Sequence, residues 1–431
     1  MNRIARRPTL VPALRSRNYR LFFFGQGVSL IGTWMTQTAT IWLVYQLTNS
    51  ALMLGIVGFT SQIPSLFLAP FGGVLVDRFN THRILVIAQI FAMMQSLTLA
   101  VLALTGTIHI WHFIFLSLFQ GVINAVDAPA RQAFVPEMVE KRDDLASAIA
   151  LNSSLVNGGR LIGPAIAGFL IAGIGAAYCF LIDGLSYIAV IAALLAMQLK
   201  PKKITVKTGN ILQRLQEGFV YVYNFAPIRS ILLLLALFSI MAMPYVTLVP
   251  IFATKILAGN AQTLGFLMAA SGVGAIGGGI YLSTRKTVVG LGDIIAAAPA
   301  ICGVGIIIFA VSRILWLSIL MSAIIGLGSI LTISSSNTVI QTIVEDDKRG
   351  RVMSLFTMSF LGMVPFGNLL AGFFADRIGA TNTLIIGGSF CIIGSLLFAR
   401  QLPKLRQAAR PVLQQRGILP QTNTSGNAKV N

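Results

Sequence analysis

Long apolar runs are the feature of this sequence that most limits its fold. Apolar residues gather into twelve runs of about 20 residues or more, long enough to cross a hydrocarbon core of about 30 Å as helices. Charged residues are only 10% of the chain, against roughly 25% in a soluble domain. We therefore predict an all-α integral membrane protein with twelve transmembrane helices, although soft boundaries leave a count of eleven open. The runs lie near 21–44, 52–76, 84–104, 110–128, 146–171, 177–199, 230–253, 263–282, 291–311, 314–337, 353–374 and 381–399.

The placement of the basic residues predicts the orientation. A net charge of +19 would suggest nucleic acid as the partner of a soluble protein. If the N-terminus is cytoplasmic, only Lys255, Arg313 and Arg377 of the 32 basic residues fall on the opposite side, and Arg160 lies inside a span. This asymmetry is the positive-inside pattern. We expect a multi-pass protein of the inner (cytoplasmic) membrane with both termini cytoplasmic, and no binding to nucleic acid.

A polar segment divides the spans into six and six. We expect a cytoplasmic linker at 200–229 between a first six-helix bundle (21–199) and a second one (230–400). Part of this linker, 210–224, is amphipathic and predicts a short helix on the membrane face. The flanking segments, 1–20 and 401–431, are assigned to the cytoplasm. The second of them is polar and basic without apolar periodicity, which predicts disorder.

The two halves contain an internal repeat. The stretch "GPAIAGFLIAGIGA" (163–176) aligns with "GNLLAGFFADRIGA" (367–380), with seven identities in fourteen residues at a shift of 204. A neighbouring stretch agrees at a shift of 205. Paired six-helix halves are the plan of secondary transporters, which rock one half against the other around a midplane site. The copies differ at Arg160, which aligns with Val364, and at Pro164, which aligns with Asn368.

Arg160 is a positive charge inside an apolar span. It lies about 21 Å from the start of its helix, close to the bilayer centre, where an arginine costs about 2.5–3.5 kcal/mol to insert. Steps of three and four residues place it on one helix face with Asn157. We expect Arg160 to serve substrate binding, gating or proton coupling. Structural pairing with a carboxylate such as Asp183 is the alternative.

Two other spans carry polar stripes at helical spacing. The uncharged groups of the first span are suited to hydrogen bonding with the polar edges of a ligand. Polar residues also join neighbouring helices, at about 0.6 kcal/mol per hydrogen bond, and that explanation stays open for each residue taken singly. Together the stripes predict a substrate pathway lined by Gln26, Thr33, Gln37, Gln120, Asn124, Asn157 and Arg160.

The loop "GGVLVDRFNTHR" (72–83) is a candidate gate. Asp77 lies at the cytoplasmic mouth beside Arg78, where it can pair with a base such as Arg131 or with the N-terminal end of a facing helix. Such a contact breaks when the halves rock. An ordinary capping role for Asp77 is the alternative. Asp127, one turn before Arg131, is assigned to the same conformational group.

The energy source is predicted from what the chain lacks and from its few membrane acids. The sequence contains no G-x-x-x-x-G-K-[ST] phosphate loop, so an ion gradient is the expected energy source. Proton coupling requires a titratable group in the pathway, and Asp183 is preferred over Asp127. A structural, hydrogen-bonded acid is the alternative for Asp183.

At these residues the chain resembles the major facilitator superfamily of transporters, over roughly 15–400. "GGVLVDR" looks like the superfamily's loop signature, with Gly73, Asp77 and Arg78 in register, whereas Asn80, Thr81 and His82 replace the usual Gly and basic residues. "GRLIGPAIAG" is similar to the helix 5 signature that marks exporters in the family. That signature is carried by Gly159, Gly163, Pro164 and Gly168, with Ala167 in place of one glycine.

The resemblance is strongest to the branch that contains the enterobactin exporter and macrolide efflux proteins. The stretches "NYRLFFFGQGVSLIGTWM" (18–35) and "INAVDAPARQAFVPEMV" (123–139) carry this likeness. Two departures concern the coupling mechanism. No arginine lies in helix 4 near Ser117, and Ser283 stands where the second loop signature would have an acid. The standard proton relay of drug antiporters is therefore not carried over.

We expect an alternating-access exporter of a small amphipathic molecule, a drug or a siderophore, that works as a proton antiporter. A lipid or lysophospholipid carrier of the same fold is the alternative, and a membrane receptor or enzyme is a weaker one. His109 and His112 lie one turn apart beside Trp111, which suggests an interfacial anchor. We expect no metal, no cofactor and no obligatory protein partner beyond the substrate, the bilayer and the proton gradient.

Overall fold

The computed structural model describes residues 12–198, 211–285, 287–416 and 418, and all regular elements within them are helices. The N-terminal half contains η1 (Pro12–Arg15), α1 (Arg17–Thr48), α2 (Ala51–Arg78), α3 (Thr81–Leu104), α4 (Ile110–Met138), η2 (Arg142–Asp144), α5 (Leu145–Gly173) and α6 (Ala177–Leu195). The C-terminal half contains α7 (Ile211–Asn224), α8 (Ala226–Met241), α9 (Tyr245–Ile251), η3 (Phe252–Ile256), α10 (Ala261–Thr284), α11 (Leu291–Val311), α12 (Leu315–Ile343), α13 (Arg349–Phe360), α14 (Val364–Ile378) and α15 (Ala380–Gln415).

Eleven segments of the described chain are long and apolar enough to cross a membrane. One of them combines α8, α9 and η3, and another combines α13 and α14. The helix α1 has 32 residues but does not belong to this set, because Gln26, Gln37 and several threonines lower its hydropathy. Like the other long helices, α1 packs within a bundle, and its main neighbours are α5 and α6. These observations confirm the predicted all-α membrane fold.

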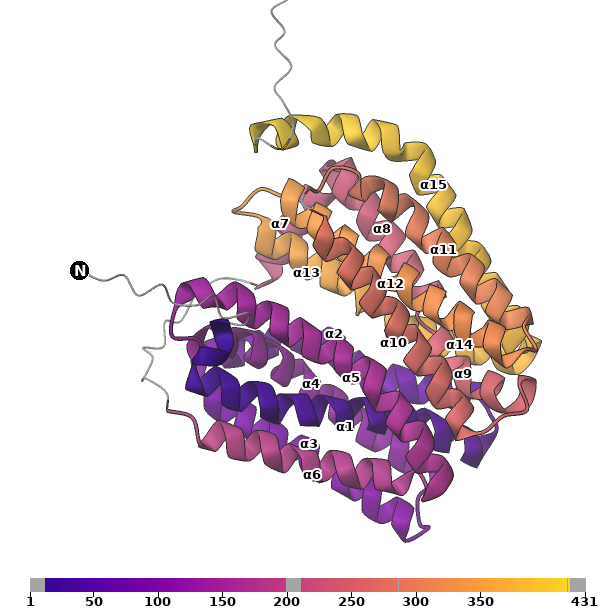
Figure 1. Ribbon diagram of the computed structural model, residues 1–431. Coiled ribbons are helices and arrows are strands. Elements are labelled where there is room, and N and C mark those ends of the chain that lie inside the picture. The colour runs from indigo at the N-terminus through magenta and orange to yellow at the C-terminus, as the bar shows by residue number, and fades with distance from the viewer. Residues whose placement is uncertain (1–11, 199–210, 286, 417, 419–431) are drawn as a thin grey trace, which may run out of the picture.

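The helices form two bundles with the same order of neighbours (Figure 1). In the first bundle the neighbours follow the order α2, α4, α3, α6, α1 and α5. The second bundle has α10, α12, α11, α15 and α8, and then α13 with α14, in the equivalent places. This order is the tertiary form of the repeat seen in the sequence. We call the end of the molecule that carries α7 the linker end, and the opposite end the seam end.

Polar residues in the short turns define where several helices begin. The hydroxyl of Ser50 accepts from the backbone N–H of Met53 at the start of α2, and the side chain of Asn80 accepts from Arg83 at the start of α3. Asn260 caps α10 in the same way through Gln262 and Thr263. Each cap satisfies N–H groups that have no partner within their helix. The caps separate consecutive spans with few intervening residues.

The linker contains the expected short helix, since α7 covers Ile211–Asn224. Residues 199–210 lie outside the described part of the chain, as do 1–11 and 419–431. Glu217 forms an ion pair of 3.0 Å with Arg351 of α13, and the ammonium group of Lys348 lies 4.6 Å from the ring centre of Tyr221. A hydrogen bond to Glu345 raises the pKa of Lys348, and burial raises the pKa of Tyr221. These contacts fix α7 to the second bundle.

The tail differs from the expectation for residues 401–415. These residues continue α15 as a helix, although Pro403 and Pro411 lie inside it. Leu405 and Ala409, one turn apart, are buried against the second bundle. The sequence-based prediction of disorder was wrong here because this apolar spacing was overlooked among the polar and basic residues. Figure 1 shows the extension arching over the linker end of the bundle.

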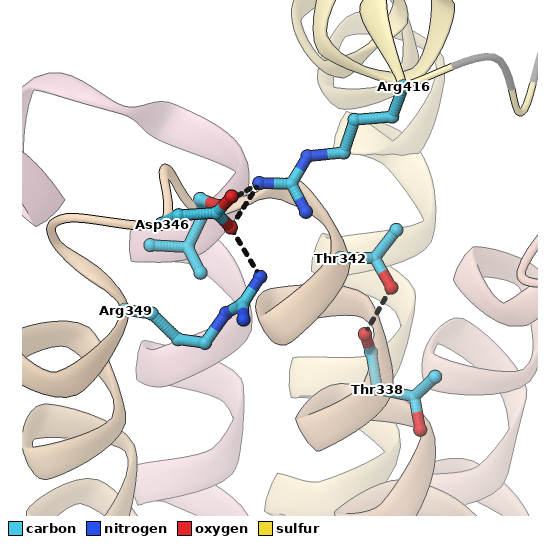
Figure 2. Close-up of polar contacts among 6 residues, drawn as sticks. Thr338, Thr342, Asp346, Arg349 and Arg416 are labelled. Atoms are coloured by element: carbon cyan, nitrogen blue, oxygen red, sulfur yellow. Dashed lines mark hydrogen bonds and ion pairs between the residues drawn. The ribbon is translucent and has the colours of Figure 1, made fainter.

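Contacts at Asp346 fix the far end of this extension (Figure 2). Asp346 lies between α12 and α13 and accepts from Arg349 at 2.5 Å and from Arg416 at 3.1 Å. Arg416 also donates to the carbonyl oxygen of Val344 at 2.6 Å. The end of α15 is therefore joined to the loop that follows α12.

Candidate functional site

The two bundles meet along two seams, one between α5 and α10 and the other between α2 and α14. Glycines allow backbone contact in both. A Cβ atom added to Gly168 would lie 3.0 Å from the Cα of Gly265, and one added to Gly372 would lie 3.0 Å from the Cα of Gly55. Gly168 and Gly372 are equivalent positions of the repeat. Both positions are glycine because each makes the same close backbone contact in its seam.

The seam between α2 and α14 also contains a polar contact. The carboxylate of Asp376 on α14 accepts from the Ser50 hydroxyl at 2.6 Å and from the backbone N–H groups of Ala51 at 2.6 Å and Leu52 at 3.2 Å. Asp376 thus caps the first turn of α2 across the bundle interface. Sequence reasoning missed this residue. Its repeat counterpart is Ala172, and this difference between the copies was the available signal.

Arg160 lies where α5 passes α10 of the opposite bundle. A Cβ atom added to Gly272 of α10 would lie 3.2 Å from the carbonyl oxygen of Arg160. The guanidinium carbon is 5.9 Å from the ring centre of Trp34 on α1. Tyr245 on α9 lies within electrostatic range of the guanidinium group, and its hydroxyl is 2.7 Å from the hydroxyl of Ser322. Arg160 is therefore a cation beside two aromatic groups, one from each bundle.

The exporter signature divides between two contacts. Gly159 and Gly163 face α1, where an added Cβ would lie 3.1 Å from a ring carbon of Trp34 and 2.6 Å from its Cβ, respectively. Pro164 and Gly168 face α10, because an added Cβ at Gly265 would lie 2.7 Å from the carbonyl oxygen of Pro164 and 2.9 Å from the Cα of Gly168. One face of α5 therefore positions Trp34, and another forms the seam.

Asp183 lies apart from Arg160. No ion pair among the described residues joins the two, so the expected alternative of a structural pair is not what the structure contains. The carboxylate accepts from Ser96 of α3 at 2.9 Å. Its Oδ1 would be 2.7 Å from a Cβ added to Gly32 of α1 and has no hydrogen-bond partner among the described side chains. Asp183 is thus buried inside the first bundle, between α1, α3 and α6.

Asp127 and Arg131 form an ion pair with each other within α4. Gln89 of α3 donates to the second carboxylate oxygen of Asp127 at 2.8 Å. The side chain of Asp77, the acid proposed as a partner of Arg131, lies outside the described part of the structure. Arg131 therefore has a carboxylate partner within its own helix.

The glycines of the loop signature have different surroundings. Gly73 has no heavy atom within 4 Å of an added Cβ. Its neighbour Gly72 faces α4, where an added Cβ would overlap the carbonyl oxygen of Ala125. The close approach of α2 to α4 therefore occurs at Gly72 and not at Gly73. Arg78 is exposed at the last position of α2.

The polar stripes differ in exposure. Thr33, Gln37 and Asn124 are exposed within their helices, whereas Gln26 is 4% exposed and belongs to the packed interior. Gln120 donates to Asn124 at 3.0 Å. Asn157 is half-buried and donates to the carbonyl oxygen of Ser153 at 2.9 Å. These local bonds leave further polar atoms of the exposed side chains free for a ligand or water.

The second bundle has a matching stripe that sequence reasoning did not identify. Gln341 of α12 donates to Asn337 at 2.8 Å, one turn apart, as Gln120 and Asn124 do in the equivalent helix α4. The polar run "SSSNTVIQT" (334–342) was the available signal. The two equivalent helices therefore each carry an amide pair.

Histidine and cysteine contacts are structural among the described residues. His109 and His112 form reciprocal hydrogen bonds at the start of α4. The three cysteines are buried and free. In the described ranges, no group of three His, Cys, Asp or Glu side chains is placed to hold a metal ion.

Comparisons with known proteins agree with this architecture. Residues 8–421 match the model of the family described as "Transmembrane secretion effector". The chain is 27% identical to the staphyloferrin A transporter of Staphylococcus aureus, over 90% of this chain and 97% of that protein. It is 25% identical to macrolide efflux protein A of Streptococcus pyogenes, over 87% of this chain and 94% of that protein.

A solved structure of a peptide-transporter-type fold is also similar. The crystal structure of a POT family transporter in complex with a thioalcohol-conjugated peptide superposes with a TM-score of 0.72 at 12% identity, covering 90% of this chain and 96% of that chain. That likeness concerns the fold alone. The family match covers nearly the whole sequence, and its members are transporters of the major facilitator superfamily. This chain therefore belongs to the transmembrane secretion effector family and is a multi-pass membrane transporter, not an enzyme.

Proposed function

We propose that this protein is a secondary active exporter of a small amphipathic molecule, a siderophore or a drug. The observation that carries the proposal is the position of Arg160, which lies at the bundle interface beside Trp34 and Tyr245 and has no carboxylate partner among the described residues. A cation beside aromatic rings suits a ligand with anionic and aromatic or apolar parts. The printed names of the relatives, a siderophore transporter and a macrolide efflux protein, support the same substrate classes.

Transport proceeds by alternating access between the two bundles. The glycine contacts and the Asp376 cap hold the seam end together, and release on that side requires them to separate. The proposed orientation places the linker end in the cytoplasm, because nearly all basic residues outside the spans gather there. The described structure then corresponds to a state closed towards the outside. Substrate enters from the cytoplasmic side.

Proton antiport supplies the energy. Asp183 is the coupling candidate, because it is 2% exposed and has no cationic partner among the described residues. It packs against Gly32 of α1, the helix that carries Trp34. A change in its protonation therefore acts on the helix beside Arg160. Asp127 already has Arg131 and Gln89 as partners and is assigned to conformational stability.

A retention experiment tests the substrate class. Cells without the gene receive the wild-type protein or the Arg160→Gln variant, and the intracellular amounts of a catecholate siderophore, a carboxylate siderophore and several macrolides are measured. Wild-type protein should lower retention of one class at least several-fold, and the variant should not. If the retention of the siderophores and of the macrolides is unchanged, and the protein moves labelled lysophospholipid in proteoliposomes, the proposed export of siderophores or drugs is wrong.

A further inference from the structure

A cavity of about 600 Å³ lies beneath the extension of α15, away from the bundle interface. Its walls come from α8, α11, α12 and α15 at the linker end. Most of the lining is apolar and includes Ile231, Ile295, Val339, Ile343 and Leu405. A volume of this size with an apolar lining and a few polar groups is typical of ligand pockets. Arg160, Asp183 and the amide pair of Asn337 and Gln341 do not line it.

The roof of the cavity is fixed at two points. Arg406 of α15 forms an ion pair of 2.5 Å with Asp293 in the first turn of α11. Ten residues later, Arg416 donates to Asp346 and to the carbonyl oxygen of Val344 (Figure 2). Thr342, also drawn in Figure 2, lines the cavity from α12. The extension that covers the cavity is therefore held by contacts between elements and not by apolar packing alone.

The rim of the cavity is basic. Arg406 and Arg410 line it from α15, and Asp293 is the single acid among the lining residues. Arg410 is exposed and has no partner among the described residues. One guanidinium nitrogen of Arg406 pairs with Asp293, so the other N–H groups of Arg406 are available to bind an anion. The cavity thus combines a positive rim with an apolar interior.

This combination lies where membrane spans end. The cavity is bordered by the first turn of α11 and the last turns of α12, two segments long and apolar enough to cross a membrane, so we place its rim at the level of the lipid headgroups. Basic pockets between transmembrane helices at this level bind anionic headgroups. A soluble anion such as free phosphate would use the rim and leave the apolar walls without a partner.

We infer that this cavity binds an anionic phospholipid. Its phosphate contacts Arg406 and Arg410, and one acyl chain lies against Val289, Val339 and Leu402, apolar lining residues that are not fully buried. The inference does not depend on which molecule the protein transports. It assigns a binding role to the extension of α15, and the unpaired charge of Arg410 becomes a recognition group.

Binding is tested on the purified full-length protein. Native mass spectrometry compares retention of phosphatidylglycerol with phosphatidylcholine for wild type and for the Arg406→Gln/Arg410→Gln variant. Each removed arginine should weaken retention of phosphatidylglycerol about fivefold, and both together about 25-fold. The matched control is Arg400→Gln/Lys404→Gln, which removes the same charge from the same helix at residues that do not line the cavity. Equal loss in both variants would mean general surface attraction and would overturn the site.

Two single variants separate recognition from structure. Asp293→Asn breaks the ion pair but keeps both arginines, so retention should stay equal or rise. A loss matching that of the double arginine variant would assign Arg406 a purely structural role and contradict the inference. Val339→Trp fills the cavity from α12 and leaves every charge in place. It should lower phosphatidylglycerol retention at least several-fold, and unchanged retention would show that no acyl chain occupies the cavity.

Discussion

At the scale of single residues, the energetic position of Arg160 needs an explanation. An arginine near the centre of a transmembrane helix costs about 2.5–3.5 kcal/mol to insert. The cation–π interaction with the Trp34 ring offsets about 0.5–2 kcal/mol of this cost, and more when the site excludes water. Tyr245 adds a polar neighbour from the other bundle. The remaining cost is not offset by any carboxylate among the described residues, so an anionic ligand group is the partner that would stabilise the charge most.

Replacing Arg160 by Gln should therefore reduce efflux much more than it reduces membrane insertion. Loss of hydrogen bonds from a charged group corresponds to about 1.5–3 kcal/mol, or about 10- to 100-fold in transport rate. The measurement is initial efflux from vesicles with matched protein amounts. Arg313→Gln, an exposed arginine between α11 and α12, is the control and should transport normally. Efflux at the wild-type rate by Arg160→Gln would mean that Arg160 has only a structural role.

Replacing Asp183 by Asn should abolish efflux driven by a pH gradient while leaving folded protein in the membrane. The asparagine oxygen can still accept from Ser96, so packing between α3 and α6 is kept, but the side chain no longer exchanges a proton. Counterflow of substrate without a gradient should persist in this variant. Normal gradient-driven efflux would exclude Asp183 as the coupling group.

At the scale of elements, the beginning of α2 and the end of α14 form one unit across the interface. Asp376 satisfies two backbone N–H groups of α2 that the helix itself cannot satisfy. A carboxylate at this position also interacts favourably with the positive end of the helix dipole. The same helix end carries Gly55, which contacts Gly372. Opening of the seam end must therefore break a cap and a backbone contact together.

Asp376→Ala should shift the protein towards the state open at the seam end. An N-cap is worth about 0.5–2 kcal/mol, which predicts a shift of about 2- to 30-fold in the equilibrium. Spin labels at Thr107 and Arg313, exposed turn residues of different bundles at the seam end, report the distance distribution. The control is Arg377→Ala, which removes a neighbour that lies over Phe373. An unchanged distribution in Asp376→Ala would mean that the cap does not hold the seam.

At the scale of the whole molecule, the two seams follow the repeat. Gly168 and Gly372 occupy equivalent positions and each contacts a glycine of the opposite bundle. In the proposed alternating access, the bundles would rock about an interface of nearly matching halves. The two seams differ in their polar and charged residues. The first seam has Arg160 and Pro164, and the second has Asp376 and Asn368. Asn368 accepts from Thr247 at 3.0 Å and packs against Gly58.

A reversible crosslink across one seam tests whether separation of the bundles is required for transport. The Ser50→Cys/Asp376→Cys variant joined by a short cleavable thiol reagent should lose efflux, and cleavage should restore it to the level before crosslinking. The two side chains are in contact in the described state, so the reagent captures it. The single-cysteine variants treated with the same reagent are the controls, since the native cysteines are buried. Full efflux by the crosslinked protein would contradict alternating access through this seam.

The positions of the spans and of the linker helix followed from the sequence, because hydropathy and helical periodicity are local properties. The expected span at 291–311 coincides with α11, and the stretch 210–224 corresponds to α7. The helix at 401–415 also has a local signal, the spacing of Leu405 and Ala409, and the prediction of disorder did not take it into account. The presence of a mid-membrane cation was also evident from composition and depth alone.

What the sequence by itself determined is the class of fold, the repeat and the residues whose placement in hydrocarbon requires a reason. Only the tertiary structure decided their partners. Asp376 contacts Ser50 from 326 positions away in the chain, and Arg160 lies beside Trp34 and not beside Asp183. The physical reason is that helix formation depends on neighbours within a few residues, whereas a hydrogen bond or a charge contact between bundles depends on how two separately formed surfaces meet.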